Sequence, residues 1–400
     1  MKTLASTTPT FLLIFLLLTV SCSSSKEKKS SSTSTEIAPA VININVEEQI
    51  KKSLFIDDLV DEVEYLPLQT TTESLIGTVD KVEITDSLIF ILDAGKALFI
   101  FDHKGNFINK IARQGKGPGE YIKMLDFNYC KRDSSLMICD INRKVLKFDV
   151  NGNFISSWRH SFQVDKIVNL GMDRYIVHNG MDYQSFTKND PYSHKIVSQG
   201  EVTDSFFEVP KYLWGVSFGE GIFTQSKNIF LKPFFSNTIY QYEDSLIAKY
   251  NINFINRNID VETLSVNKKS IGSPLEILKS IIVDNNRCGG ISDIVENRNY
   301  LFFSFMAMEG VTNKNYLSGN PINCLYSLKD SSCKVFKHLI SSKYIFNPIS
   351  SYNDFFVSVV QPYSIVEDRD DLPEEMRTLF ADISSEDNPV LVFYKLKENQ

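Results

Sequence analysis

Short hydrophobic runs separated by turn sequences recur along most of this chain. Ile89 to Ile108 reads IFILDAGKALFIFDHKGNFI and Leu136 to Ile155 reads LMICDINRKVLKFDVNGNFI, so the two stretches repeat at a spacing of 47 residues. The repeat aligns Gly105 with Gly152, and glycine at a hairpin turn supplies the positive φ that the turn needs. A period of this length, made of short β-type runs, is typical of radial or stacked repeat architectures.

Each repeat predicts four antiparallel strands, which is the make-up of a propeller blade. In the first repeat we expect strands at 78–85, 88–92, 97–101 and 107–112, and the second repeat extends from Met124 to Arg159. Later strands are expected at 228–233, 238–242, 246–252, 299–306, 323–328, 333–339 and 390–396, with a weaker set within 167–207.

Two stretches break the β pattern and predict helical insertions, at about 255–287 and 367–388. Each holds a helix-like run that begins with a proline, Pro274 or Pro373, which favours the first turn of a helix. With these insertions set aside, residues 63–400 hold about six repeat units. We therefore predict an all-β, six-bladed β-propeller. Because a closed ring protects its strand edges, Val63 to Gln69 should pair with Val390 to Leu396 in one blade.

The N-terminus has the pattern of a bacterial export signal. Lys2 precedes an apolar run at 11–20, which is too short to span a bilayer, and Ser21-Cys22 follows. This pattern predicts a lipoprotein signal peptide over residues 1–21, with Cys22 as the lipidated residue and the membrane as a partner through that lipid. The alternative is an ordinary secretory signal. Residues 22–62 are expected to form a disordered tether and lead-in.

Charge and cysteine content narrow the classes of function. The formal net charge of −7 disfavours a nucleic-acid partner, because such a partner requires a clustered basic face. With Cys22 assigned to lipid, five of the six cysteines remain, so at least one thiol is unpaired within the chain. Cys324 and Cys333 flank one hairpin turn, and a disulfide between them is left open.

The candidate ligand-binding residues lie on one predicted face. In a four-stranded meander, the loops between second and third strands share a face with the loops between blades. Function concentrates on loops held by a rigid scaffold. The polar residues that this rule groups are Asp93, Lys96, Arg113, Lys116, Glu120, Asp140, Arg143, Asn237 and Asn313.

Two motifs on this face have both a structural and a functional interpretation. The run RQGKGPGEY, from Arg113 to Tyr121, could expose backbone N–H groups to an anion, or it is a tight crossover between blades. Asp93 and Asp140 occupy matched repeat positions, where they cap a turn or contact a ligand or a Ca²⁺ ion. The five dispersed histidines form no metal or catalytic motif, so we predict no catalytic residue and no required cofactor.

Several segments resemble a known group of proteins. SLIGTVDKVEI, IFILD, IFDHKGNFI and RQGKGPGEY, together with VEYLPLQTTTESLIG and DNPVLVFYKLK, are similar to segments of the six-bladed β-propeller lipoproteins of Gram-negative bacteria, which are related in architecture to NHL-repeat propellers. The resemblance spans residues 60 to 400. It implies the fold and a place in the cell envelope, with the outer membrane as the expected site of anchoring.

These observations favour a lipid-anchored, non-catalytic binding module whose ligand is a glycan, a peptide or a protein. Two alternatives remain at this point. One is a metal-dependent enzyme of the lactonase or lyase type, which would hold its metal in the central channel. The other is a structural subunit of an envelope complex, which would present a large apolar patch.

Overall fold

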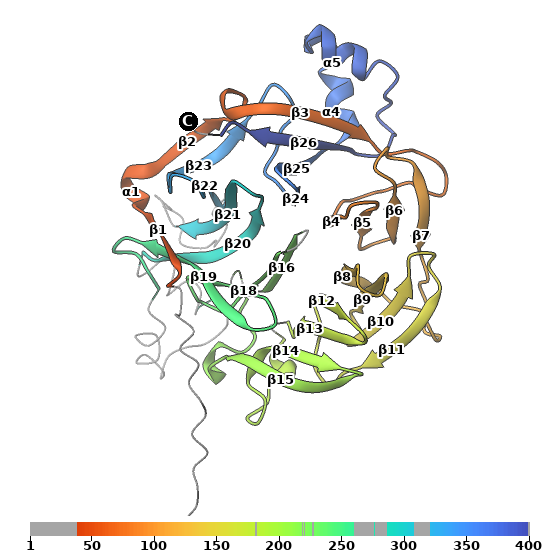
Figure 1. Cartoon of the computed structure of the whole chain (residues 1–400), viewed down its shortest axis with the longest axis vertical. Coiled ribbons are helices and arrows are strands. Elements are labelled where there is room, and N and C mark those ends of the chain that lie inside the picture. The colour runs from red at the N-terminus through yellow and green to blue at the C-terminus, as the bar shows by residue number, and fades with distance from the viewer. Residues whose placement is uncertain are drawn as a thin grey trace, which may run out of the picture. The chain divides into compact units, whose positions relative to one another are not determined.

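Six β-sheets surround a common centre (Figure 1). The computed structural model describes residues 38–180, 182–217, 219, 221–225, 228–259, 276, 286–307 and 321–398. Each sheet is one blade, with its first strand nearest the centre and its last strand at the rim. The predicted six-bladed β-propeller is therefore confirmed.

The first three blades each contain four antiparallel strands in chain order. Blade 1 consists of β4 (Lys81–Ile84), β5 (Ile89–Asp93), β6 (Ala97–Phe101) and β7 (Phe107–Ile111). Blade 2 consists of β8 (Met124–Cys130), β9 (Ser135–Asp140), β10 (Lys144–Asp149) and β11 (Phe154–Arg159). Blade 3 consists of β12 (Lys166–Gly171), β13 (Arg174–His178), β14 (Tyr192–Ser198) and β15 (Glu201–Glu208).

The last three blades are completed by strands from the N-terminal segment. Blade 4 consists of β16 (Gly221–Gln225), β17 (Asn228–Lys232), β18 (Thr238–Tyr242) and β19 (Leu246–Phe254), with β1 (Ala40–Ile44) outside β19. Blade 5 consists of β20 (Cys288–Glu296), β21 (Tyr300–Ala307), β22 (Ile322–Ser327) and β23 (Cys333–Ile340), with β2 (Ile50–Phe55) outside β23. Blade 6 consists of β24 (Ser350–Tyr352), β25 (Phe355–Val360), β26 (Val390–Leu396) and β3 (Val60–Pro67).

The ring closes by the predicted pairing of the two ends of the propeller. β3 lies antiparallel to β26, in a register that runs from Val390 opposite Pro67 to Leu396 opposite Val60. The paired segment begins three residues earlier than the predicted Val63 and ends at Pro67. This pairing completes a four-stranded blade from two distant parts of the chain.

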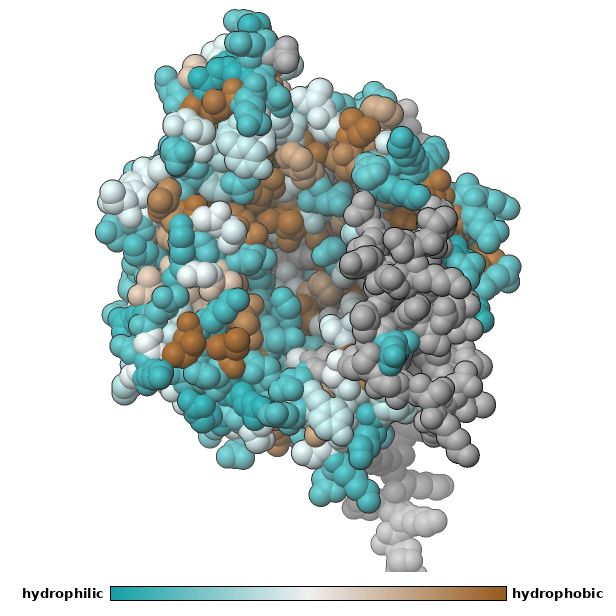
Figure 2. Space-filling view, turned by 180° about the vertical axis from the view of Figure 1, so that it is seen from behind, coloured by the Kyte–Doolittle hydropathy of each residue, from teal (hydrophilic) through white to brown (hydrophobic). Residues whose placement is uncertain are grey.

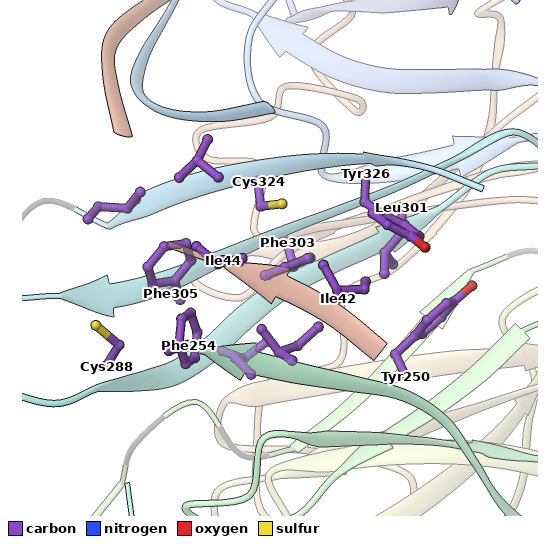
Figure 3. Packing of buried hydrophobic residues seen from close by; sticks show 14 of the residues in the cluster. Ile42, Ile44, Tyr250, Phe254, Cys288, Leu301, Phe303, Phe305, Cys324 and Tyr326 are labelled. Atoms are coloured by element: carbon purple, nitrogen blue, oxygen red, sulfur yellow. The ribbon is translucent and has the colours of Figure 1, made fainter. Parts of the chain in front are cut away.

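The predicted tether and lead-in at 22–62 is wrong from residue 40 onward, because this stretch contains β1 and β2. Both strands add in parallel to the outer strands of blades 4 and 5. Ile42 and Ile44 of β1 are buried, and they point between β19 and β21 (Figure 3). The alternation of buried and exposed residues in AVINI is that of a strand, but five residues between polar stretches gave little signal. Residues 22–37, including Cys22, lie outside the described part of the chain.

Hydrophobic side chains fill the spaces between neighbouring blades. Phe90, Leu92 and Leu98 of blade 1 pack against Phe127 and Leu136 of blade 2. All five residues of β5 and all five of β6 are buried, whereas the rim strand β11 alternates between half-buried and exposed. Middle strands are covered on both faces, so their sequences are continuous apolar runs. In rim strands, buried and exposed residues alternate along the sequence.

The helices within the described residues are short. They are α1 (Val46–Gln49), α4 (Pro362–Glu367) and α5 (Glu374–Leu379), with 3₁₀ turns η1 (Asp57–Leu59), η2 (Tyr183–Ser185), η3 (Lys211–Leu213) and η6 (Arg369–Asp371). The predicted insertion at 367–388 is helical, although its helix ends at Leu379 and α4 precedes it. The predicted insertion at 255–287 lies mostly outside the described residues. Among the described residues, no helix has the length and apolarity needed to cross a membrane.

Candidate functional site

A pocket of about 280 Å³ lies at the centre of the ring. Its walls come from the first strand of five blades, from β21 of blade 5 and from the segment just before β24 of the sixth blade. Figure 2, which views the disc from behind, shows a hollow near the centre of this face. The polar residues that line the pocket are Asp80, Lys81, Asp126, Lys166, Thr224, Asp293, Ser304 and Asn347. Every blade thus contributes at least one hydrogen-bonding side chain to one small space.

An ion pair joins the first two blades at the wall of this pocket. Nζ of Lys81 lies 2.8 Å from Oδ1 of Asp126, and it also donates to the carbonyl oxygen of Phe127. The other carboxylate oxygen of Asp126 accepts the backbone N–H of Ile167 on β12 at 3.0 Å. Because the Asp126 side chain is almost fully buried, these bonds compensate for its loss of solvent. They also connect the inner strands of three consecutive blades.

Lys166 brings a second cation to the pocket. The Asp126 carboxylate raises the pKa of Lys166, an effect that burial opposes and that Asp165 and Asp80 reinforce. The side chain therefore stays protonated at neutral pH. Its ammonium group donates no hydrogen bond to any residue that the structure describes, so its donors face the pocket without a fixed partner.

A β-bulge directs Asp293 into the pocket from blade 5. The register between β20 and β21 shifts twice, between Gly289 and Ser292 and again between Ser292 and Val295. Asp293 lies in the second irregularity with φ at 50°, a conformation that costs energy for a residue other than glycine. Bulges of this kind redirect a side chain and are common beside binding sites. The exposed Asp293 carboxylate accepts one hydrogen bond, from Ser292 at 3.2 Å.

Thr224 of β16 is part of the wall of the same pocket. Its Oγ1 atom is buried and has no hydrogen-bond partner among the described residues. A buried hydroxyl without a partner costs free energy unless water or a ligand satisfies it. A ligand or water molecule that reaches this atom from the pocket would supply the missing hydrogen bond.

Outside the pocket, a chain of amide and carboxyl groups links the inner strands. Glu83 on β4 accepts hydrogen bonds from the Asn128 side chain and from the Tyr129 N–H on β8. Asn128 in turn accepts the N–H of Asn169 on β12 at 2.8 Å. Burial raises the pKa of Glu83 to about 7, against the opposing effect of Lys81.

Asp93 and Asp140 act as turn caps. Oδ2 of Asp93 accepts the N–H groups of Gly77 and Thr78, and Oδ1 of Asp140 accepts those of Ile122 and Lys123. Both side chains are buried. The first of their two predicted roles is therefore confirmed, and each carboxylate joins the start of its blade to the end of the second strand.

The glycine-rich loop holds an anion that belongs to the chain itself. The Glu120 carboxylate accepts the N–H of Gly117 at 2.7 Å. Gly119 adopts a φ of 73°, and a Cβ atom there would lie 2.7 Å from the ring of Phe154. These contacts agree with a tight crossover between blades. Arg113 and Lys116 in this loop are exposed.

The remaining candidate residues are spread over the predicted face. Lys96 is exposed, while Arg143 donates to the carbonyl of Ser161 and lies 3.6 Å from Asp182. Asn237 donates to Asn258 at 2.9 Å. Asn313 lies outside the described residues. A ligand contact for these side chains stays a prediction.

The residues that line the pocket were not among the predicted binding residues, because binding was expected on loops and most of these residues lie on inner strands. Lys81 and Asp126 belong to the first strand of each repeat, and first strands line the channel of a propeller. Polar residues within first strands are the signal that could have found them. For a metal, the described residues offer no group of three or more His, Cys, Asp or Glu side chains placed to bind one ion.

The fold and its axial pocket define this chain as a six-bladed β-propeller with a polar centre. The chain belongs to the family described as "Domain of unknown function (DUF4934)", which matches residues 41–395. A comparison with curated protein sequences found no match.

A solved structure shares the fold, and a second shows a weaker likeness. A Bacteroides fragilis protein that is described as exported has a TM-score of 0.69 at 18% identity, over 90% of this chain and 100% of the other. A member of the DUF4221 family from Bacteroides vulgatus has a TM-score of 0.47 at 10% identity, over 86% of this chain and 98% of the other. At 18% identity, the likeness to the Bacteroides fragilis protein concerns the fold alone.

Proposed function

We propose that the protein is a non-catalytic binding module of the bacterial envelope, anchored through lipid on Cys22, and that its axial pocket receives a small polar ligand. The observation that carries this proposal is the convergence of hydrogen-bonding groups from six blades on one pocket. Pockets with a few placed polar groups on a rigid scaffold are the usual sites for small ligands.

The envelope location has two supports. The first is the signal sequence that ends at Ser21-Cys22. The second is the fold shared with a Bacteroides fragilis protein that is described as exported.

The charges of the pocket favour an uncharged, hydroxyl-rich ligand such as a sugar unit of a glycan. Lys81 is already paired with Asp126, and Lys166 lies in the field of the same carboxylate. Asp293 adds a further carboxylate, so the pocket is slightly acidic and disfavours anions. Hydroxyl groups match the free donors of Lys166 and the hydroxyl of Thr224, while half-buried Phe223 offers an aromatic surface.

Calorimetric titration of the mature full-length protein tests this proposal. The probes are neutral mono- and oligosaccharides, compared with dipeptides of similar size. We expect at least one sugar to bind, and Thr224→Val to weaken that binding by about 2- to 10-fold, because the variant keeps the shape of the side chain but loses one hydrogen bond. Lys104→Ala, at an exposed turn next to Gly105, is the control and should bind like the wild type.

If dipeptides bind and sugars do not, the ligand of the pocket is a peptide. If Thr224→Val and Asp293→Asn leave the affinity of every bound probe unchanged, the axial pocket is not the binding site. A longer glycan or a protein ligand would extend onto the predicted loop face, which carries Lys96 and Lys116. The charge reversals Lys96→Glu and Lys116→Glu would then weaken the binding of the larger ligand only.

A further inference from the structure

Two cysteines face each other in blade 5. Their sulfur atoms lie 2.7 Å apart, between β22 and β23. Non-bonded carbon atoms rest about 3.5–4.0 Å apart and sulfur is larger than carbon, so this separation is short for two independent thiols. The two residues are Cys324 and Cys333, which flank one hairpin turn in the sequence.

The strand register explains why the side chains meet. Cys324 is opposite Val335, and Cys333 is opposite Tyr326. Residues 333 and 335 of one strand point to the same face of the sheet, and Cys324 shares that face with its partner Val335. The two cysteines are therefore diagonal neighbours on one face, and their sulfur atoms meet across this diagonal.

The surroundings of the pair are apolar. Cys324 is fully buried in the cluster that contains Ile44 and Phe303 (Figure 3). Cys333 is half-buried at the border of this cluster. The other described cysteines lie in different strands, Cys130 in β8, Cys139 in β9 and Cys288 in β20.

We propose that Cys324 and Cys333 are joined by a disulfide bond in the mature protein. The oxidant is the disulfide of a thiol–disulfide exchange protein of the compartment to which the chain is exported. The thiolate of one cysteine attacks the donor disulfide to form a mixed disulfide, and the second cysteine then displaces the donor. Two electrons and two protons pass to the donor, which leaves as a dithiol.

The difference in exposure assigns the order of attack. Cys333 is partly accessible, so it forms the mixed disulfide, and Cys324 resolves it from within the sheet. Burial raises the pKa of the Cys324 thiol well above its usual range, which makes Cys324 a poor first nucleophile in the folded state.

The bond would strengthen the part of blade 5 on which β2 docks. Ile50 of β2 lies opposite Val335 of β23, two residues from Cys333. The inference shares the oxidising location with the proposed function and does not depend on the pocket. Its failure would therefore leave ligand binding untouched.

Peptide mapping tests the disulfide. The full-length protein is isolated from the envelope of the host, alkylated with iodoacetamide in denaturant without reductant, and digested. We expect a cross-linked peptide pair that carries Cys324 and Cys333, about 2 Da lighter than the two separate thiol peptides, because two hydrogen atoms are lost. Cys130, Cys139 and Cys288 should be alkylated. Recovery of Cys324 and Cys333 mainly as alkylated peptides would overturn the proposal.

Thermal unfolding provides an independent test. Dithiothreitol should lower the melting temperature of the wild type, and it should leave the melting temperature of Cys324→Ser and of Cys333→Ser unchanged. Cys130→Ser, in blade 2, is the matched control and should keep the full response to reductant. If the wild type and Cys333→Ser respond equally to dithiothreitol, no bond joins the pair.

Discussion

Glu83 on β4 accepts a hydrogen bond of 3.0 Å from the side-chain amide of Asn128 on β8, across the boundary between the first two blades. The Tyr129 N–H adds a second hydrogen bond to the same carboxyl group. Side chains therefore satisfy polar groups on inner strands that have no neighbouring strand on one side. The same contact places an ionisable group where solvent does not reach it, which gives the fold a dependence on pH.

The Glu83→Gln substitution should flatten the pH dependence of stability. Burial raises the pKa of Glu83 from 4.5 to about 7, so the folded state binds the proton more tightly than the unfolded state. The stability from Glu83 is full below pH 4.5 and is lost as pH rises through about 7. The loss is on the order of 3 kcal/mol. Urea unfolding between pH 4 and 8 measures it, with Glu64→Gln on the exposed side of β3 as the control.

An equal slope for Glu83→Gln and the wild type over this range would show that the carboxyl ionises freely in the folded state. Glu83 would then not belong to the buried network of the inner strands.

Strand β1 supplies a matched pair of substitutions on its two faces. Ile44 is fully buried between blades 4 and 5, whereas Val41 is 53% exposed. Ile44→Ala should lower the free energy of unfolding by about 2–5 kcal/mol, because it leaves a cavity in the core. Val41→Ala should change it by less than about 0.5 kcal/mol. Chemical denaturation of both variants makes the comparison, and equal effects would mean that β1 is not docked in solution.

The two glycines of the repeat should differ in their tolerance to alanine. Gly105 and Gly152 have φ values of 79° and 77°, so both substitutions carry the cost of about 1 kcal/mol for a left-handed alanine. A Cβ at Gly105 would lie 2.3 Å from the carbonyl oxygen of Pro67, while at Gly152 the nearest atom is Asn109 Nδ2 at 3.2 Å. Gly105→Ala should therefore be the more destabilising, as measured by thermal unfolding.

A smaller loss for Gly105→Ala than for Gly152→Ala would indicate that Pro67 moves away at little cost. In that case β3 would hold the first blade less firmly than its backbone contacts imply.

The repeat predicted most of the architecture because its strands carry strong local signals. The second blade extends from Met124 to Arg159 as expected, and the last strand is Val390–Leu396 as expected. The first strands of blades 4 and 5 were not predicted, since GIFTQ is short and the CGGISDIVE strand contains two glycines and a bulge.

The axial pocket could not be located in the same way. Its residues come from seven separate segments, and nothing local to Lys166 or Asn347 indicates that they meet. The orientation of Asp293 depends on a register shift against β21, and register is a property of the pair of strands rather than of either sequence. The contact between Cys324 and Cys333 likewise depends on the register between β22 and β23.

The position of β1, β2 and β3 on the rim also affects how the chain is assembled. These strands are synthesised first, yet they rest on β19, β23 and β26, the last of which ends at Leu396. Such long sequence separation slows folding, because loop closure must precede the contacts that reward it. β3 is therefore synthesised early but can pair only after β26 has been made, and the ring of blades closes only at that point.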